Sequence, residues 1–131
     1  MTAADLYAAA LAAAARAHPP FSGLHVGAVI EAEDGSPHAG GNVEFGSYGL
    51  TICAECVALV KGVSEGHRRF RRVGVARSDG LPISPCGACR QALADFGLDM
   101  TVVYMAPGGL VERPLRDLLP DAFQLDREAA R

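Results

Sequence analysis

The apolar and polar positions divide the chain into short elements, of which the first are a helix and two strands. A run rich in alanine and leucine has helical spacing and predicts a helix that starts at Thr2 or Asp5 and ends near His18, before two prolines. Apolar runs at 24–32 and 37–43 flank an Asp-Gly turn and predict a β-hairpin. The glycine inside the first of these strands predicts that a neighbouring element approaches closely there.

The rest of the chain alternates helical and extended patterns. Helices are predicted over residues 53–65 and 86–96, and Thr51 is the predicted cap of the first. Strands are predicted at 73–77, 100–105 and 110–113, followed by one helical turn at 114–119. This order predicts an α/β fold, a three-layer α-β-α sandwich with a central mixed five-stranded sheet.

Composition and charge narrow the class of protein. Half of the 131 residues are apolar and 21% are charged, which predicts one globular domain over residues 1–131, with a tail that frays from about residue 124. The net charge of -3 argues against a nucleic acid polymer as partner. No apolar run is long enough for a membrane span and no signal peptide is recognisable, so a cytoplasmic protein is expected. His25, His38 and His67 are expected at exposed positions.

All four cysteines lie in two Cys-x-x-Cys segments, Cys53 with Cys56 and Cys86 with Cys89. In a reducing compartment such pairs indicate a zinc site rather than disulfides. Each segment falls where a predicted helix begins, and free backbone N–H groups there stabilise thiolates. Two alternatives remain open: a closed structural site with four cysteines, or a site with three cysteines and a water on which Glu55 acts.

The segments Cys-Ala-Glu at 53–55 and Pro-Cys-Gly-Ala-Cys-Arg-Gln at 85–91 together resemble the zinc-dependent cytidine deaminases. Further segments that resemble this family in the same order lie at 26–28, 42–44, 47–52 and 118–123. The resemblance covers residues 20–123 and implies the cytidine deaminase fold.

The resemblance implies a zinc-dependent hydrolysis of cytidine and 2′-deoxycytidine to uridine and 2′-deoxyuridine, with release of ammonia, as in pyrimidine salvage. Cys53, Cys86 and Cys89 are then the ligands of one Zn²⁺ ion per chain, which activates a water. Glu55 is the catalytic residue that takes the proton of this water and passes it to the pyrimidine and to the departing amine. The small members of the family are homotetramers with shared active sites, which is expected here too.

The same resemblance implies a set of substrate contacts. Asn42 and Glu44, on the same face of a strand end, are expected to bind the ribose hydroxyls. The backbone of Ala54 is expected to contact the base, and Phe123 to reach into the site of a neighbouring subunit. The expected substrate-binding residues are Asn42, Glu44, Ala54, Leu24, Phe45, Tyr48 and Phe123.

Three positions depart from the pattern of the family. Leu24 stands where a phenylalanine commonly stacks on the base, and Phe45 stands where asparagine is common. Cys56 stands where an arginine commonly offsets the charge of the thiolates. These departures keep two alternatives in view: a deaminase of a modified or antibiotic cytosine nucleoside such as blasticidin S, and a non-enzymatic domain stapled by zinc on four cysteines.

Overall fold

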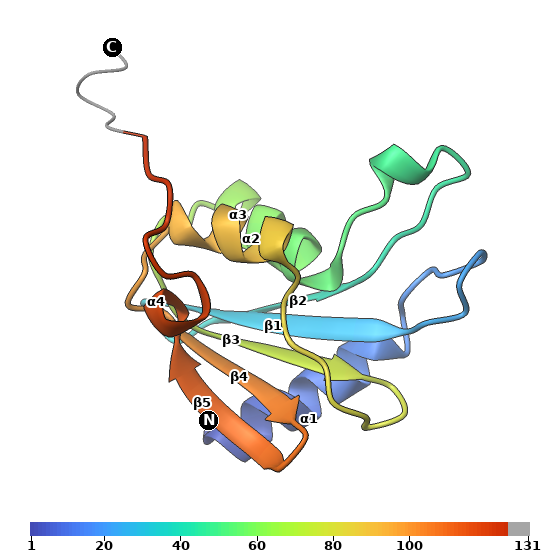
Figure 1. The fold of residues 1–131 in the computed structure, drawn as a ribbon, viewed down its shortest axis with the longest axis horizontal. Coiled ribbons are helices and arrows are strands. Elements are labelled where there is room, and N and C mark those ends of the chain that lie inside the picture. Colours follow the sequence, from blue (N-terminus) through green and yellow to red (C-terminus); the bar gives the residue numbers. More distant parts are fainter. Residues whose placement is uncertain (126–131) are drawn as a thin grey trace.

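The chain forms one mixed sheet in the computed structural model, which describes residues 1–125 (Figure 1). Its strands are β1 Val26–Ala32, β2 Pro37–Gly41, β3 Phe70–Arg77, β4 Thr101–Ala106 and β5 Gly109–Pro114. They are ordered β2-β1-β3-β4-β5, and only β3 and β4 run parallel. The predicted mixed five-stranded sheet is therefore confirmed.

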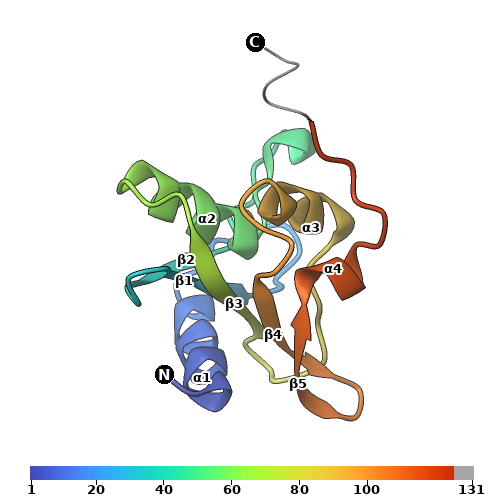
Figure 2. The same cartoon turned by 90° about the vertical axis from the view of Figure 1, so that its left-hand side faces the viewer.

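Helices cover both faces of this sheet. Helix α1, Ala3–Ala14, lies on one face, and helices α2, Ala54–Ser64, and α3, Gly87–Ala94, lie together on the other (Figure 2). The short helices are η1 at Tyr48–Leu50 and α4 at Leu115–Leu118. This arrangement confirms the predicted three-layer sandwich, and it brings the starts of α2 and α3 to the same side of the molecule.

The first helix begins as predicted and ends earlier. Thr2 caps it, because the Thr2 hydroxyl accepts from the backbone N–H of Asp5 at 3.1 Å and the Asp5 carboxylate accepts from the N–H of Thr2 at 2.8 Å. The helix ends at Ala14, whereas the prediction placed its end near His18. His18 precedes a proline, which disfavours helical backbone, and its N–H and carbonyl pair with the segment after β2.

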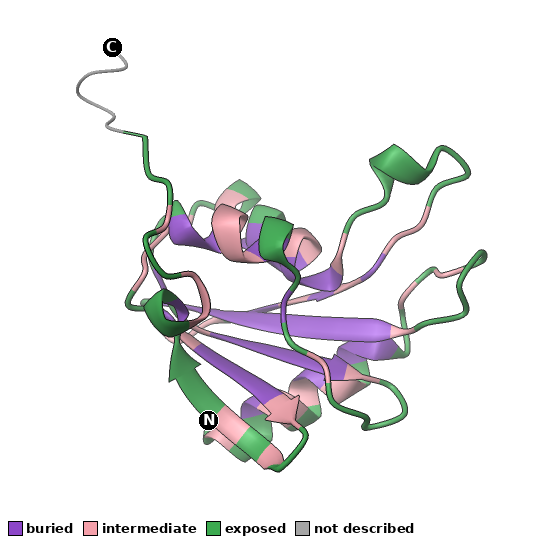
Figure 3. Ribbon diagram, viewed as in Figure 1, coloured by how far each residue is buried: buried purple, intermediate pink, exposed green. Residues whose placement is uncertain are grey.

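Two glycines allow the helices to approach the sheet closely. A Cβ on Gly27 of β1 would lie 2.0 Å from the carbonyl oxygen of Ala10 in α1, which confirms the predicted close approach. A Cβ on Gly40 of β2 would lie 2.6 Å from the backbone nitrogen of Ala58 in α2. Strand β1 contacts both α1 and α2, and all seven of its residues are buried (Figure 3).

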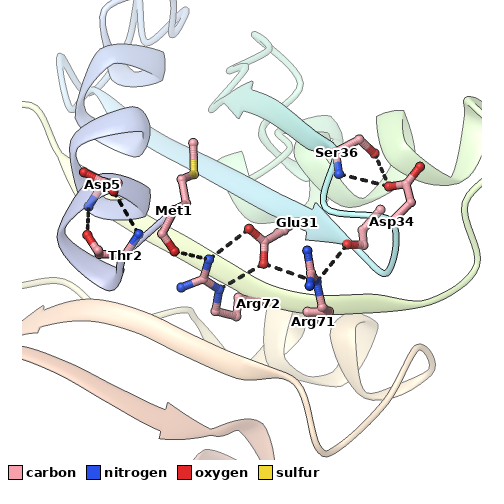
Figure 4. A network of polar contacts seen from close by, with 9 residues as sticks. Met1, Thr2, Asp5, Glu31, Asp34, Ser36, Arg71 and Arg72 are labelled. Carbon is pink, nitrogen blue, oxygen red and sulfur yellow. Dashed lines mark hydrogen bonds and ion pairs between the residues drawn. The ribbon is translucent and has the colours of Figure 1, made fainter.

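Glu31, Arg71 and Arg72 form a charged network at the end of the β1–β2 hairpin that lies away from the cysteines. The carboxylate of Glu31, buried at the end of β1, accepts two hydrogen bonds from Arg72 at 3.0 and 2.9 Å and lies 3.4 Å from Arg71 (Figure 4). Arg72 also donates to the carbonyl of Met1 at 2.7 Å and so ties the N-terminus to β3. The hydrogen bond from Arg72 holds the pKa of Glu31 below its usual value, so this buried carboxylate stays ionised and paired.

The prediction that the histidines are exposed is wrong for His38, which is buried in β2. Its Nδ1 lies 2.8 Å from the Glu65 carboxylate, and its Nε2 lies 3.0 Å from the Ser36 hydroxyl. The end of α2 packs over β2 at this point, so the ring is covered while both of its nitrogens have partners. His25 and His67 are half-buried.

Three further predictions concern a membrane span, the C-terminal tail and the number of domains. Within residues 1–125, no helix has the length and apolar character needed to cross a membrane. Most of the tail that was predicted to fray from about residue 124 lies outside the described residues. The organisation of residues 1–131 as one domain stays a prediction.

Candidate active site

Both Cys-x-x-Cys segments begin a helix, and in each the first cysteine is the N-cap. Cys53 caps α2 and Cys86 caps α3, both with extended backbone. The prediction that Thr51 caps α2 is wrong. Residues 51–52 remain extended because Ile52 pairs with the segment after β2, and the Thr51 hydroxyl instead accepts from the N–H of Phe45 at 3.2 Å.

Three sulfur atoms converge between the two helix starts. The Sγ atoms of Cys53, Cys86 and Cys89 all lie within 4.8 Å of one another, and those of Cys53 and Cys86 are 3.8 Å apart. Tetrahedral zinc with bonds of about 2.3 Å separates its sulfur ligands by about 3.8 Å, so this donor set fits the ion. The backbone N–H of Cys89 also points at the Cys86 sulfur at 3.5 Å, a contact that stabilises a thiolate.

The fourth cysteine does not join this group. The sulfur of Cys56 lies 3.4 Å from that of Cys89, and Cys56 is half-buried whereas Cys89 is buried. This hydrogen bond lowers the pKa of Cys56 to about 7 and raises the pKa of Cys89 above its usual value, because the pair shares one proton. Among residues 1–125 the geometry thus favours three ligands over the alternative of four.

The Cys53 thiol holds its proton tightly when no cation is present. Burial, with the neighbouring Cys86 and Glu55, raises the pKa of Cys53 to about 11. A metal ion must therefore displace protons when it binds, and binding couples to pH.

Glu55 follows Cys53 by two residues and lines the same cavity. If Cys53 were helical, Glu55 would point about 200° away from it on an ideal helix. Because Cys53 is the extended N-cap, this objection disappears, and both side chains reach the cavity. Glu55 is only 4% exposed, and burial raises the pKa of its carboxyl group. A raised pKa makes the carboxylate a better proton acceptor, which is what a group that takes a proton from a water and returns it requires.

The cavity beside the sulfurs has a volume of about 220 Å³. It is lined by Leu24, Val26, Asn42, Glu44, Thr51, Ile52, Cys53, Ala54, Glu55, Ile83, Ser84 and Cys86. Its walls are mainly apolar, with acids and an amide at separate points, as in a site for a small polar ligand. Five lining residues were not among the predicted site residues: Val26, Thr51, Ile52, Ile83 and Ser84. The last two directly precede the second cysteine segment.

Asn42 and Glu44 are both held in place by backbone groups. The Asn42 side chain accepts from the N–H of Val26 at 2.8 Å and donates to the carbonyl of Leu24 at 2.9 Å. The Glu44 carboxylate accepts from the N–H groups of residues 21 and 22, each at 3.0 Å, and from the Ser22 hydroxyl. The hydrogen bonds from Ser22 lower the pKa of Glu44. Both side chains therefore present fixed polar atoms to the cavity.

Three of the predicted substrate-binding residues are not among those that line this cavity: Phe45, Tyr48 and Phe123. All three are exposed. Tyr48 lines a neighbouring hollow of about 370 Å³ and packs edge-on against Phe21 with ring centres 5.7 Å apart. Phe123 lies near the end of α3, where its carbonyl accepts from Gln91 at 2.7 Å. Their role in binding stays a prediction.

The fold and the site define the class of zinc-binding deaminases, in which three metal ligands lie beside an acid that is not a ligand. The family model described as the cytidine and deoxycytidylate deaminase zinc-binding region matches residues 1–106, and the chain belongs to this family.

Similar proteins cover most of the chain. Cytidine deaminase from Sporosarcina psychrophila is 42% identical over 110 residues, which are 82% of this chain and 81% of that protein. Blasticidin-S deaminase from Bacillus cereus is more distant, 32% identical over 104 residues, with 73% and 74% covered. The crystal structure of cytidine deaminase from Burkholderia pseudomallei superposes with a TM-score of 0.87 at 41% identity and covers 94% of this chain and 100% of its own.

Proposed function

We propose that the protein hydrolyses cytidine and 2′-deoxycytidine to uridine and 2′-deoxyuridine, with release of ammonia. The observation that carries this proposal is the buried Glu55, which shares one cavity with the cysteine cluster. Its support is the family to which the chain belongs and the curated relatives named cytidine deaminase. The more distant blasticidin-S deaminase makes an antibiotic nucleoside the weaker candidate.

Cys53, Cys86 and Cys89 would hold the zinc ion, which would supply an acidified water as the nucleophile. Glu55 moves the protons. Its carboxylate takes a proton from the water, passes it to N3 of the pyrimidine as C4 is attacked, and takes the second proton from the oxygen. That proton goes to the amino group, the C4–N4 bond breaks, and ammonia leaves as the carbonyl of uridine forms. One water is consumed for each ammonia released, so atoms and charge balance.

The residues that line the cavity are assigned to the base and to the sugar of the nucleoside. We assign the base to the apolar part beside Leu24, Val26 and Ile83, where water is excluded around the reacting carbon. The N–H of Ala54 lies at the start of α2 and is assigned to the base. Asn42 and Glu44 are assigned to the sugar hydroxyls, because their carbonyl and carboxylate oxygens are acceptors that the backbone already holds in position.

We also propose a homotetramer with shared active sites, and a role in pyrimidine salvage in the cytoplasm. The exposed aromatic and aliphatic residues beside the cavity support the assembly: Phe21, Phe45, Tyr48, Leu50 and Ile52. The segment between β2 and α2 that carries most of them projects from the body of the fold (Figure 1). A second subunit that covers it would bury apolar surface and bring Phe45, Tyr48 or Phe123 near a neighbouring cavity. Sedimentation of the purified chain tests the assembly.

The direct test of activity is the loss of cytidine absorbance with the zinc-loaded chain, beside the variant Glu55→Gln. We expect turnover by the wild type and none by the variant, with one zinc per chain in both. A wild type that binds zinc yet leaves cytidine and deoxycytidine unchanged would refute the proposed substrates.

A further inference from the structure

Glu44 lines both the cavity beside the sulfurs and the neighbouring hollow. Its carboxylate is held by the loop between α1 and β1. One oxygen, Oε1, accepts from the backbone N–H groups of Phe21 and Ser22, each at 3.0 Å, and the other, Oε2, accepts from the Ser22 hydroxyl. A serine from a distant part of the sequence therefore contacts the carboxylate that is assigned to the sugar.

The direction of the hydroxyl contact is fixed by its neighbours. The Ser22 oxygen accepts from the backbone N–H of Leu24 at 3.0 Å, and an N–H group can only donate. The single hydrogen of the hydroxyl is therefore free for Glu44. The hydrogen bonds from Ser22 also lower the pKa of Glu44, so its carboxylate is ionised at neutral pH and can only accept. Ser22 thus links Glu44 to Leu24, and both of these residues line the cavity.

These contacts leave one acceptor position on the carboxylate open. An ionised carboxylate has about four such positions, two on each oxygen. Donors among residues 1–125 fill both positions on Oε1 and one on Oε2. Ser22 lines the hollow and is not one of the residues that line the cavity, so it approaches the carboxylate from the hollow. The remaining position, on Oε2, is left for a donor in the cavity.

The two backbone N–H groups do not orient the carboxylate by themselves. Both hold Oε1, so Oε2 can swing about that oxygen while the two hydrogen bonds persist. The Ser22 hydroxyl is the contact that fixes Oε2, the atom with the open position. Hydrogen bonds to an ionised group are stronger than those between neutral groups, so loss of this one should have a measurable effect.

We propose that Ser22 is a positioning residue for the sugar of the substrate: it orients Oε2 of Glu44 so that this atom accepts from a single hydroxyl of the nucleoside. The carboxylate does not bind two neighbouring hydroxyls in a bidentate way, because the loop already fills Oε1. The inference rests on the proposed function, since the hydroxyl belongs to the proposed substrate.

The kinetic test compares three variants of the serine. Ser22→Ala removes the hydroxyl, Ser22→Thr keeps it, and Ser22→Val has the shape of threonine without the hydroxyl. We expect kcat/KM for cytidine to fall about fivefold to thirtyfold in the alanine and valine variants, and to stay near the wild type in the threonine variant. An unchanged kcat/KM in Ser22→Ala, or equal losses in the threonine and valine variants, would overturn the proposal.

A panel of substrates tests whether one hydroxyl is involved. The 2′-deoxy, 3′-deoxy and 5′-deoxy forms of cytidine each lack one hydroxyl of the sugar. The form that lacks the hydroxyl bound by Glu44 should lose no further rate in Ser22→Ala, whereas the other two should respond as cytidine does, because only coupled changes are non-additive. Two insensitive forms would mean that the carboxylate binds two hydroxyls, and none would mean that Ser22 does not act on the sugar. Either result would contradict the inference.

Carbon-13 NMR of the Glu44 carboxyl group gives a readout that needs no turnover, with the signal assigned by its absence in Glu44→Gln. Loss of a donor to the carboxylate favours the protonated form, so the pKa of Glu44 should rise in the alanine and valine variants and not in the threonine variant. An unchanged titration in Ser22→Ala would overturn the proposal. Circular dichroism verifies the fold of each variant.

The two readouts separate this inference from the proposed function. The expected titrations in a wild type that deaminates none of the four nucleosides would refute the proposed function and leave the positioning of Glu44 by Ser22 standing. Normal turnover by the wild type, with Ser22→Ala unchanged in rate and titration, would refute the inference and leave the function standing.

Discussion

The starts of helices α2 and α3 carry the same Cys-x-x-Cys spacing and differ in what they contribute to the centre. The N-cap sulfurs of both, Cys53 and Cys86, belong to the converging group. At the third helical position, Cys89 of α3 joins them, whereas Cys56 of α2 stops 3.4 Å from Cys89. Equal spacing thus leads to unequal positions relative to the converging group.

The intervening residues separate the roles further. Helix α3 has small residues between its cysteines, Gly87 and Ala88, and supplies two of the converging sulfurs. Helix α2 has Ala54 and Glu55 there and supplies one converging sulfur and a buried acid. In the proposed mechanism, one helix start mainly holds the metal and the other brings the group that moves protons. The following predictions test this division, from the largest expected effect to the smallest.

The strongest test exchanges the two cysteines at the third helical position for alanine, one at a time. Cys89→Ala should abolish stoichiometric zinc binding and activity, because two remaining thiolates do not complete the site. Cys56→Ala should retain about one zinc per chain. Metal analysis after gel filtration measures both. Equal zinc loss in the two variants would mean that the helix starts are equivalent and that the site uses four cysteines.

The acid of α2 is tested by Glu55→Gln, which keeps the shape and removes the proton-accepting carboxylate. We expect cytidine turnover to fall by about a hundredfold to ten-thousandfold, the usual contribution of a general acid–base group. Zinc content should not change, since Glu55 is not one of the converging ligands. A steady-state assay with metal analysis measures both quantities. Loss of zinc together with activity would instead assign Glu55 to the holding of the metal.

The pH dependence of zinc binding tests the ligand protons. The pKa of Cys53 is about 11 and that of Cys89 is also raised, so at neutral pH both are thiols in the metal-free chain. Zinc must displace protons from its ligands, so apparent affinity should rise with pH, by about tenfold per unit for each proton released. Chelator competition between pH 6 and 8 measures the slope. A flat profile would contradict the assigned ligands.

The packing of the two helix starts is compared by two glycine variants. In Gly40→Ala, the new Cβ would lie 2.6 Å from the backbone of α2, so the helix must move and the free energy of unfolding should fall by about 1–3 kcal/mol. Gly87→Ala, at the start of α3, meets nothing within 4 Å and should be neutral or slightly stabilising. Denaturant unfolding of the zinc-loaded chains compares them. Equal destabilisation would show that the contact with Gly40 is not what holds α2.

Much of this fold could be predicted from the sequence, because particular residues determine where its helices begin and where they pack against the sheet. Thr2 and Asp5 form a capping box, and the close approach at Gly27 needs a residue without a side chain. The end of α1 was placed too late because alanine-rich sequence continues to Ala17 in a helical pattern. There, pairing of His18 with a distant segment overrides local propensity.

The site was predictable where residue type and spacing carry the chemistry, as for Cys53, Cys86 and Cys89. The placement of Cys56 was not, since its contact spans thirty-three residues and depends on how α2 packs beside α3. Burial of His38 was hidden for a similar reason, because the end of α2 covers it.

The distance along the chain between the two N-cap sulfurs has a consequence for folding. Cys53 and Cys86 are thirty-three residues apart, and β3 lies between them. A metal ion bound to both sulfurs would close this stretch into a loop, as a covalent cross-link would. In the chain-entropy description, closing a loop of this length restricts the unfolded ensemble by about 3–4 kcal/mol. A zinc ion that serves catalysis would therefore also stabilise the fold around the middle of the sheet. The melting temperature should then rise with the zinc content, even in the inactive variant Glu55→Gln.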